Sequence, residues 1–220
     1  MGKHEMPRRR SGLNNFNLSG CVISRPRLRR VGERKECRFW VCDGLNAKEA
    51  KLEVEAVTHG QRAVELSERL AVGDRVALTG MFQASAVQIA GGQVLDYEFL
   101  LSHVDPGEML EGKCVERGGL NILAMSGAVT KAPDIAGLPG QDECVFWLCD
   151  GDSEEESSVR LPVFVAPGKV SALLDHLEVG DRLAIGGFLR SRKRFVAGSH
   201  MYEYQAVATH VDGGFLSSGE

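Results

Sequence analysis

The sequence contains an internal repeat at an offset of 107 residues, and this repeat limits the possible folds of the chain more than any other feature. The octapeptide CRFWVCDG, from Cys37 to Gly44, returns as CVFWLCDG from Cys144 to Gly151. The same offset aligns NFNLSGCVISRP with ILAMSGAVTKAP, and LAVGDRVALTG with LEVGDRLAIGG. Because one offset fits all three segments, we expect the chain to contain one domain twice.

Each copy has the element order of a small barrel. Apolar and polar residues alternate near 16–22, in the octapeptide and near 52–56, as in half-buried strands, and Phe39 and Phe146 of the octapeptides are expected in the core. A stretch of helical period at 61–71 and two more alternating runs follow, and the second copy repeats the order, with a helix expected at 168–178. The sequence therefore predicts an all-β protein of two tandem OB-folds, each a five-stranded barrel with a short helix between strands three and four.

A glycine interrupts the first strand of each copy, in the dipeptides Ser19-Gly20 and Ser126-Gly127. A glycine inside a strand commonly marks a bulge, or a bend where a small barrel curls. We expect such a feature at both positions.

The repeat also sets the expected domain boundaries. The first OB-fold domain is predicted at 13–105 and the second at 118–214, with a linker at 106–117. Residues 1–12, which include three consecutive arginines, are expected to form a basic, flexible N-terminal arm. The chain has no apolar run near 18 residues, so we expect a cytoplasmic protein without membrane contact.

The reactive residues do not form a pattern typical of a metal site or an enzyme. The six cysteines include no Cys-x-x-Cys pair, and Cys37 and Cys42 should point to opposite faces of one strand. We therefore expect small, reduced thiols and no metal or cofactor. His103 and His210 end strands without a nucleophile near them in sequence, and no nucleotide-binding loop is present, so no enzymatic activity is expected.

Positive charge is concentrated in two segments of an acidic chain. The net charge is −4, and Lys and Arg number 16 against 13 acidic residues in 1–107, but 10 against 17 in 108–220. One cluster lies in the expected loop between strands one and two of the first copy: Arg25, Arg27, Arg29 and Arg30. The other lies in the expected loop between strands four and five of the second copy: Arg190, Arg192, Lys193 and Arg194.

Both clusters are candidates for contact with nucleic acid. These loops border the usual binding face of an OB-fold, and cations there can contact phosphates. The other interpretation is that they are solvated hairpin tips. Trp40 and Trp147 are candidates for stacking on bases, or alternatively for a hydrophobic seam between the two barrels.

The chain resembles bacterial single-stranded DNA-binding proteins, and more closely the primosomal replication protein N family. The resemblance rests on NFNLSGCVISRPRLRR followed by CRF, on LPVFV from Leu161 and on VGDRLAIGGF from Val179. It implies an OB-fold that binds single-stranded DNA and normally assembles from two one-barrel chains. This chain would then be a covalent pseudo-dimer, and two such chains would form a pseudo-tetramer. Members of the family place aromatic residues on the third strand, where this chain has Phe164 alone.

The sequence therefore predicts single-stranded DNA binding without strong sequence preference. The expected setting is an accessory role in DNA replication, restart, repair or mobile-element maintenance, with replication or recombination proteins as partners. Two alternatives stay open. The barrels could be a protein-interaction module with little affinity for nucleic acid, since fold does not determine function, or they could bind RNA.

Overall fold

The computed structural model of the chain describes residues 12–44, 47–89, 92–105, 119–136, 143–151, 159–165, 177–196 and 198–214. The predicted N-terminal arm up to residue 11, the predicted linker and residues 168–176 of the second predicted helix lie outside the described residues.

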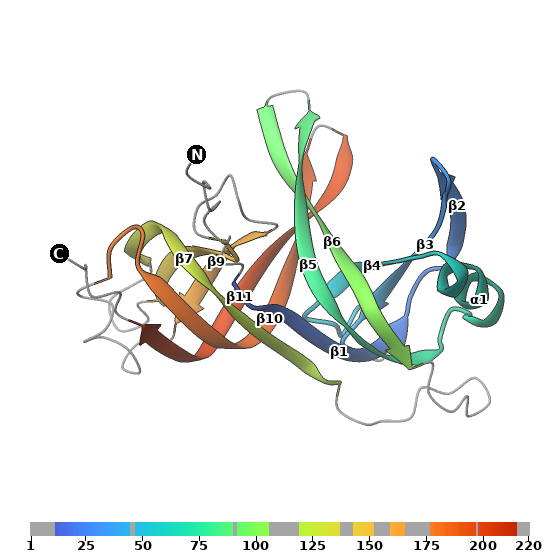
Figure 1. Ribbon diagram of the computed structural model, residues 1–220, viewed down its shortest axis with the longest axis horizontal. Helices are drawn as coiled ribbons and strands as arrows, with labels where there is room; N and C mark the ends of the chain where they lie inside the picture. Colours follow the sequence, from blue (N-terminus) through green and yellow to red (C-terminus); the bar gives the residue numbers. More distant parts are fainter. Residues whose placement is uncertain are drawn as a thin grey trace, which may run out of the picture.

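The described elements follow the predicted order in both copies, except for one additional strand in the first (Figure 1). The first copy contains β1 (Asn14–Val22), β2 (Arg27–Val31), β3 (Arg34–Cys42), β4 (Glu53–His59), α1 (Gln61–Arg69), β5 (Arg75–Ile89) and β6 (Gly92–Asp105). The second contains β7 (Asn121–Ala136), β8 (Glu143–Cys149), β9 (Arg160–Val165), β10 (Arg182–Val196) and β11 (Ser199–Gly214). The helix predicted at 61–71 is confirmed, two residues shorter at its end.

Each copy closes into a barrel through its first strand. β1 pairs with β5 along most of its length and with β3 at its end, while β4 pairs with β3 and runs parallel to β6. In the second copy β7 pairs with β10 and β8, and β9 pairs with β8 and runs parallel to β11. This strand order is that of the OB-fold, so the predicted fold class is confirmed.

The first barrel carries one strand more than predicted. The segment expected to be a loop contains β2, which pairs with β3 from Arg27↔Arg38 to Val31↔Arg34, and Gly32 supplies the positive φ of 59° in the turn. Every residue of β2 is exposed. Because neither face of β2 is buried, its sequence lacks the alternation by which strands are recognised.

Two pairs of glycines at the 107-residue offset lie where backbones approach closely: Gly20 with Gly127, and Gly80 with Gly187. A Cβ on Gly20 would overlap the carbonyl oxygen of Cys42, and one on Gly127 would overlap that of Cys149. These contacts lie where β1 meets β3 and β7 meets β8, so the glycines allow each barrel to close. The register shifts between β5 and β6 and between β10 and β11 lie instead at Gly80 and Gly187.

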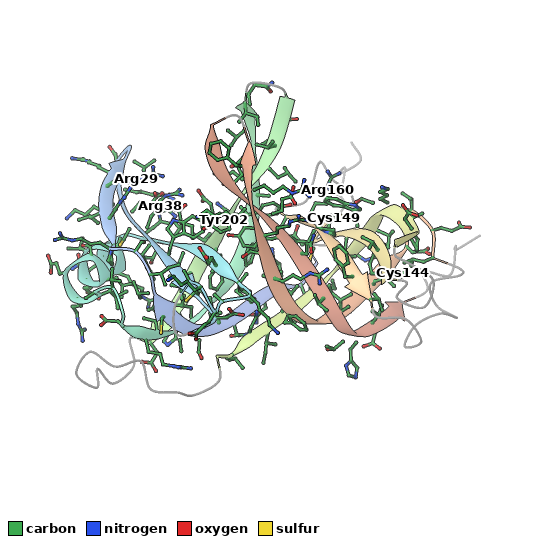
Figure 2. All side chains as sticks on the ribbon, turned by 180° about the vertical axis from the view of Figure 1, so that it is seen from behind. Arg29, Arg38, Cys144, Cys149, Arg160 and Tyr202 are labelled. Atoms are coloured by element: carbon green, nitrogen blue, oxygen red, sulfur yellow. The ribbon has the colours of Figure 1, made fainter. Side chains whose placement is uncertain are left out.

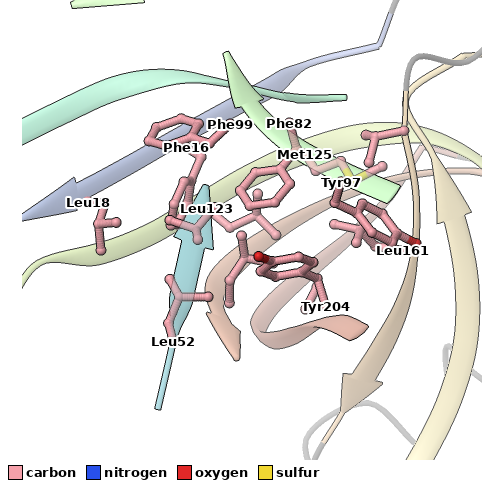
Figure 3. Packing of buried hydrophobic residues seen from close by; sticks show 14 of the residues in the cluster. Phe16, Leu18, Leu52, Phe82, Tyr97, Phe99, Leu123, Met125, Leu161 and Tyr204 are labelled. Carbon is pink, nitrogen blue, oxygen red and sulfur yellow. The ribbon is translucent and has the colours of Figure 1, made fainter. Parts of the chain in front are cut away.

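The two barrels share one hydrophobic core (Figure 3). Phe16 contacts Phe82 and Phe99 edge to face, with ring centroids 5.3 and 4.9 Å apart. Phe39 and Phe146, the phenylalanines of the repeated octapeptide, are both fully buried, as the alternation predicts. Residues of both copies belong to the same buried cluster. The barrels therefore stabilise each other by burying apolar surface at their junction.

One cysteine differs from expectation. Cys37, Cys42, Cys144 and Cys149 carry free thiols, and burial, aided by the charge of Glu36, raises the pKa of Cys37 to about 11. Cys21 is disulfide-bonded, so the expectation of reduced thiols is wrong for this residue. Spacing along the chain carried no signal of this bond, because a disulfide requires proximity in space.

Within the described residues, no cluster of three or more His, Cys, Asp or Glu side chains could hold a metal ion. None of the helices described there is long and apolar enough to cross a membrane.

Candidate nucleic-acid interface

The first strands of the two barrels pair with each other. β1 and β7 are antiparallel, with Phe16 opposite Leu123, and they join both barrels into one eleven-stranded sheet. The Ser19 amide donates to the Leu120 carbonyl, and the Leu120 amide donates to the Ser19 hydroxyl oxygen. Ser126 and Leu13 make the equivalent pair of hydrogen bonds. The junction is therefore nearly two-fold symmetric, as in a dimer of equivalent subunits.

Two asparagines reinforce this junction from equivalent positions. The Asn14 side-chain amide donates to the Phe82 carbonyl at 2.6 Å and to the Asp150 carboxylate of the other barrel at 2.8 Å. Asn121 repeats the arrangement with the Leu189 carbonyl at 2.7 Å and with Asp43 at 3.3 Å. Each asparagine therefore links its own barrel to the Asp-Gly turn that ends the octapeptide in the other.

The two long hairpins, β5–β6 and β10–β11, cross above this junction (Figure 1). Tyr97 on β6 donates its hydroxyl to the Arg160 carbonyl at 2.9 Å, and the equivalent Tyr204 on β11 donates to the Glu53 carbonyl at 2.9 Å. The two tyrosine rings meet edge to face with centroids 5.4 Å apart, and both are buried (Figure 3). Each hairpin is thus anchored on the opposite barrel.

We expect Tyr97→Phe and Tyr204→Phe each to lower the free energy of unfolding by about 1 to 2 kcal/mol, because each leaves a partly buried carbonyl without its donor. The rings would still pack. Chemical denaturation followed by circular dichroism measures the change, and Gln93→Ala near the exposed hairpin tip is the control that should leave stability unchanged. Equal stability of wild type and both phenylalanine variants would contradict the assigned anchoring role.

The second-copy cluster lies on a strand, which corrects the predicted loop. Arg190, Arg192, Lys193 and Arg194 belong to β10, whose pairing with β11 continues to Val196↔Ser199. The strand was missed because its outer part extends beyond the barrel as a two-stranded ribbon. Arg190 donates to Gln205 at 2.8 Å, and Arg194 pairs with Glu203 at 2.7 Å.

The first-copy cluster lies on and next to the extra hairpin. Arg25 precedes β2, and Arg27, Arg29 and Arg30 belong to it, all of them exposed. Arg29 donates to Glu36 at 2.5 Å. The β2–β3 and β10–β11 hairpins project toward the same side of the molecule (Figure 1). The fold thus places both basic clusters on one side, although they come from different barrels and different hairpins.

The two tryptophans have different surroundings despite their equivalent positions. Trp40 lies against Tyr202 of the other copy, with ring centroids 4.6 Å apart, and so contributes to the contact between barrels. Trp147 lies under the guanidinium of Arg160, 4.8 Å from its ring centroid. Both side chains are partly exposed. Stacking on bases therefore stays a prediction for each of them.

Trp147 lines a cavity of about 530 Å³ between the β5–β6 hairpin and the second barrel. Its walls are mainly apolar and aromatic, and its lining also includes Arg160, Arg194 and Glu203. Next to it, Arg190 lies 4.4 Å from the ring centroid of Phe164. The cavity is therefore a site where aromatic rings and guanidinium groups meet.

The corresponding face of the first barrel carries an ion-pair cluster. Arg38, which Figure 2 shows near Arg29 in the first barrel, contacts Glu36 at 2.6 Å, Glu55 at 2.9 Å and Glu98 at 2.5 Å. Burial acts to raise the pKa of Glu36, but hydrogen bonds from Arg38 and Arg29 outweigh it and hold the pKa below its ordinary value. Burial and the charge of Glu98 raise the pKa of Asp96. Carboxylates therefore outnumber cations on this face.

Sequence reasoning missed several residues of this region. Tyr97 and Tyr204 recur at the 107-residue offset, which was an available signal, but their partners are backbone carbonyls that no side-chain pattern reveals. No motif in the sequence marks Arg160, which occupies the position of Glu53 in the first copy. A comparison of charges at equivalent positions would have found it.

The fold is shared with known structures along nearly its whole length. The wild-type single-stranded DNA binding protein from Thermus aquaticus superposes with a TM-score of 0.73 at 18% sequence identity, covering 96% of this chain and 97% of that one. A deletion variant of the same protein gives a TM-score of 0.73 at 18% identity, covering 95% of this chain and 98% of that one. No protein-family model matches the chain, and no curated protein sequence matches it. The likeness confirms that this chain has the fold of that protein.

Proposed function

We propose that this chain binds single-stranded DNA without strong sequence preference and without enzymatic activity. The observation that carries the proposal is the position of the β2–β3 and β10–β11 hairpins, which hold the two basic clusters and both project from one side of the paired barrels (Figure 1). Cations along such a surface would contact phosphates, and phosphate contacts do not depend on base identity. The shared fold with a single-stranded DNA binding protein supports the same function.

The finer parts of the proposal follow from the sequence resemblance. The chain would act as an accessory in DNA replication, restart, repair or mobile-element maintenance, in the cytoplasm. It would be a member of the single-stranded DNA-binding or primosomal replication protein N group that combines two barrels, at 13–105 and 118–214, in one pseudo-dimeric chain. Two chains would assemble into a pseudo-tetramer.

Titration of fluorescently labelled oligo-dT, oligo-rU and duplex DNA tests the function. We expect oligo-dT to bind at micromolar or lower protein concentration, with affinity falling steeply between about 50 and 200 mM salt. Duplex DNA should bind more weakly, because its bases are stacked and paired and cannot reach aromatic side chains. Preference for oligo-rU would indicate RNA as the ligand, and the lack of any salt-sensitive single-strand binding would contradict the proposal.

The second candidate function is a protein-interaction module. The carboxylates around Arg38 favour it, since a phosphate strand would be repelled from that face of the first barrel. A folded protein that fails to bind oligo-dT at low salt would support this alternative.

A further inference from the structure

The two barrels differ at several equivalent positions of the same face. Three acidic residues of the first barrel are replaced in the second by an arginine, a proline and an amide: Glu53 becomes Arg160, Glu55 becomes Pro162, and Glu98 becomes Gln205. Two further replacements add an aromatic ring and a cation to the second barrel: Val57 becomes Phe164, and Val87 becomes Arg194. Against these, Arg38 becomes Val145, and Asp96 stays acidic as Glu203, which lines the cavity beside Trp147. The net change in charge still favours a nucleic-acid strand on the second barrel.

The second barrel combines open space with rings and cations. The cavity of about 530 Å³ has Trp147 and Phe164 in its lining, and a guanidinium lies over each ring, 4.8 Å from the first and 4.4 Å from the second. Flat bases can stack on such rings or on the guanidinium planes. Arg194 also lines the cavity, where it pairs with Glu203 at 2.7 Å, and is the cation there that phosphates could contact.

At the equivalent place the described part of the first barrel does not have an open cavity lined by aromatic rings and basic side chains. Tyr202 covers Trp40, and its hydroxyl donates to the Glu53 carboxylate at 2.6 Å. The neighbouring cavity is smaller, about 240 Å³, and its lining contains Glu55 and Asp96 but no basic side chain. A strand placed there would bring its phosphates close to carboxylates and would have to displace Tyr202.

We propose that the two barrels have different roles in binding the strand. The cavity beside Trp147 in the second barrel binds unstacked bases of the single strand, and the equivalent face of the first barrel does not. The inference rests on the proposed single-strand binding and assigns its base-binding part to one barrel. The first barrel contributes through its β2 cluster, of which Arg29 borders the carboxylate face through its contact with Glu36, and through the hairpin that forms one wall of the cavity.

The two tryptophans, the only ones in the chain, distinguish the barrels by fluorescence. Trp40→Phe leaves Trp147 as the reporter, and Trp147→Phe leaves Trp40. On titration with oligo-dT, we expect strong quenching in Trp40→Phe and nearly unchanged emission in Trp147→Phe. Similar quenching in both variants, or quenching of Trp40 alone, would overturn the division of roles.

Phe164→Val, which installs the residue of the first barrel, tests the same site by affinity. Loss of a stacked base should weaken oligo-dT binding about 5- to 150-fold. The control Glu55→Gln, on the carboxylate face of the first barrel, should not weaken it. Thermal melting of both variants shows whether they fold, and the tryptophan measurement does not depend on either.

Anisotropy of a labelled oligonucleotide, recorded in the same titrations, separates the two proposals. If the labelled strand binds but Trp147 is not quenched, the base-binding site is wrong and single-strand binding stands. If the strand does not bind at low salt, single-strand binding fails and the division of roles fails with it.

Discussion

Gly20→Ala and Gly127→Ala are each expected to lower the free energy of unfolding by about 3 kcal/mol or more. In both variants the new Cβ would lie far inside 3.0 Å of a carbonyl oxygen, that of Cys42 or that of Cys149, a separation that real Cβ atoms essentially never show. The clashing atoms belong to the backbone of the strand that closes the barrel, so no side-chain rotation can relieve the overlap. The barrel would have to open between its first strand and the octapeptide strand.

Gly186→Ala is the matched control for these variants. A Cβ there meets its nearest neighbour, the His210 Cβ, at 3.8 Å, an ordinary contact, and no positive φ strains it. We expect its stability to stay within about 1 kcal/mol of the wild type. Denaturant unfolding of the three variants measures the difference. If Gly20→Ala and Gly127→Ala were as stable as Gly186→Ala, the close approach of the strands would be wrong.

Changing Arg190, Arg192, Lys193 and Arg194 together to alanine should flatten the salt dependence of oligo-dT binding by about 2 to 3 units of slope. Each phosphate contact on a single strand contributes about 0.7 units through released counterions. Changing Arg27, Arg29 and Arg30 should flatten it by about 2 units. Both effects should be nearly independent of base sequence, because phosphate contacts position a strand without reading it.

The occluded site size gives a second measurement for these variants. If the strand crosses both barrels, either variant should bind a shorter length of oligonucleotide. Arg69→Ala, which removes an exposed charge from α1, is the control and should leave slope and site size unchanged. Unchanged affinity and slope in both cluster variants would show that the clusters are solvated hairpin tips, and single-strand binding would lose its main support.

The repeat and the alternation of apolar residues were sufficient to predict the fold class. Alternation is local, so Phe39 and Phe146 could be assigned to the core before any contact was known, and both are buried. The outer parts of β2 and β10 could not be recognised in this way. They are ribbons without a buried face, so pairing with a neighbouring strand, rather than burial, makes them strands.

The sequence by itself determined two copies of one barrel, the positions of the basic clusters and the residues that fill the cores, because repeats, charge and period are properties of neighbouring residues. Only the tertiary structure decided how the copies meet: β1 against β7, Tyr97 and Tyr204 on carbonyls of the opposite barrel, and Trp40 covered by Tyr202 while Trp147 faces a cavity. These contacts join residues from different copies, far apart in the chain. Equivalent positions in the sequence therefore acquire different surroundings, since each side chain's environment is built by the other copy.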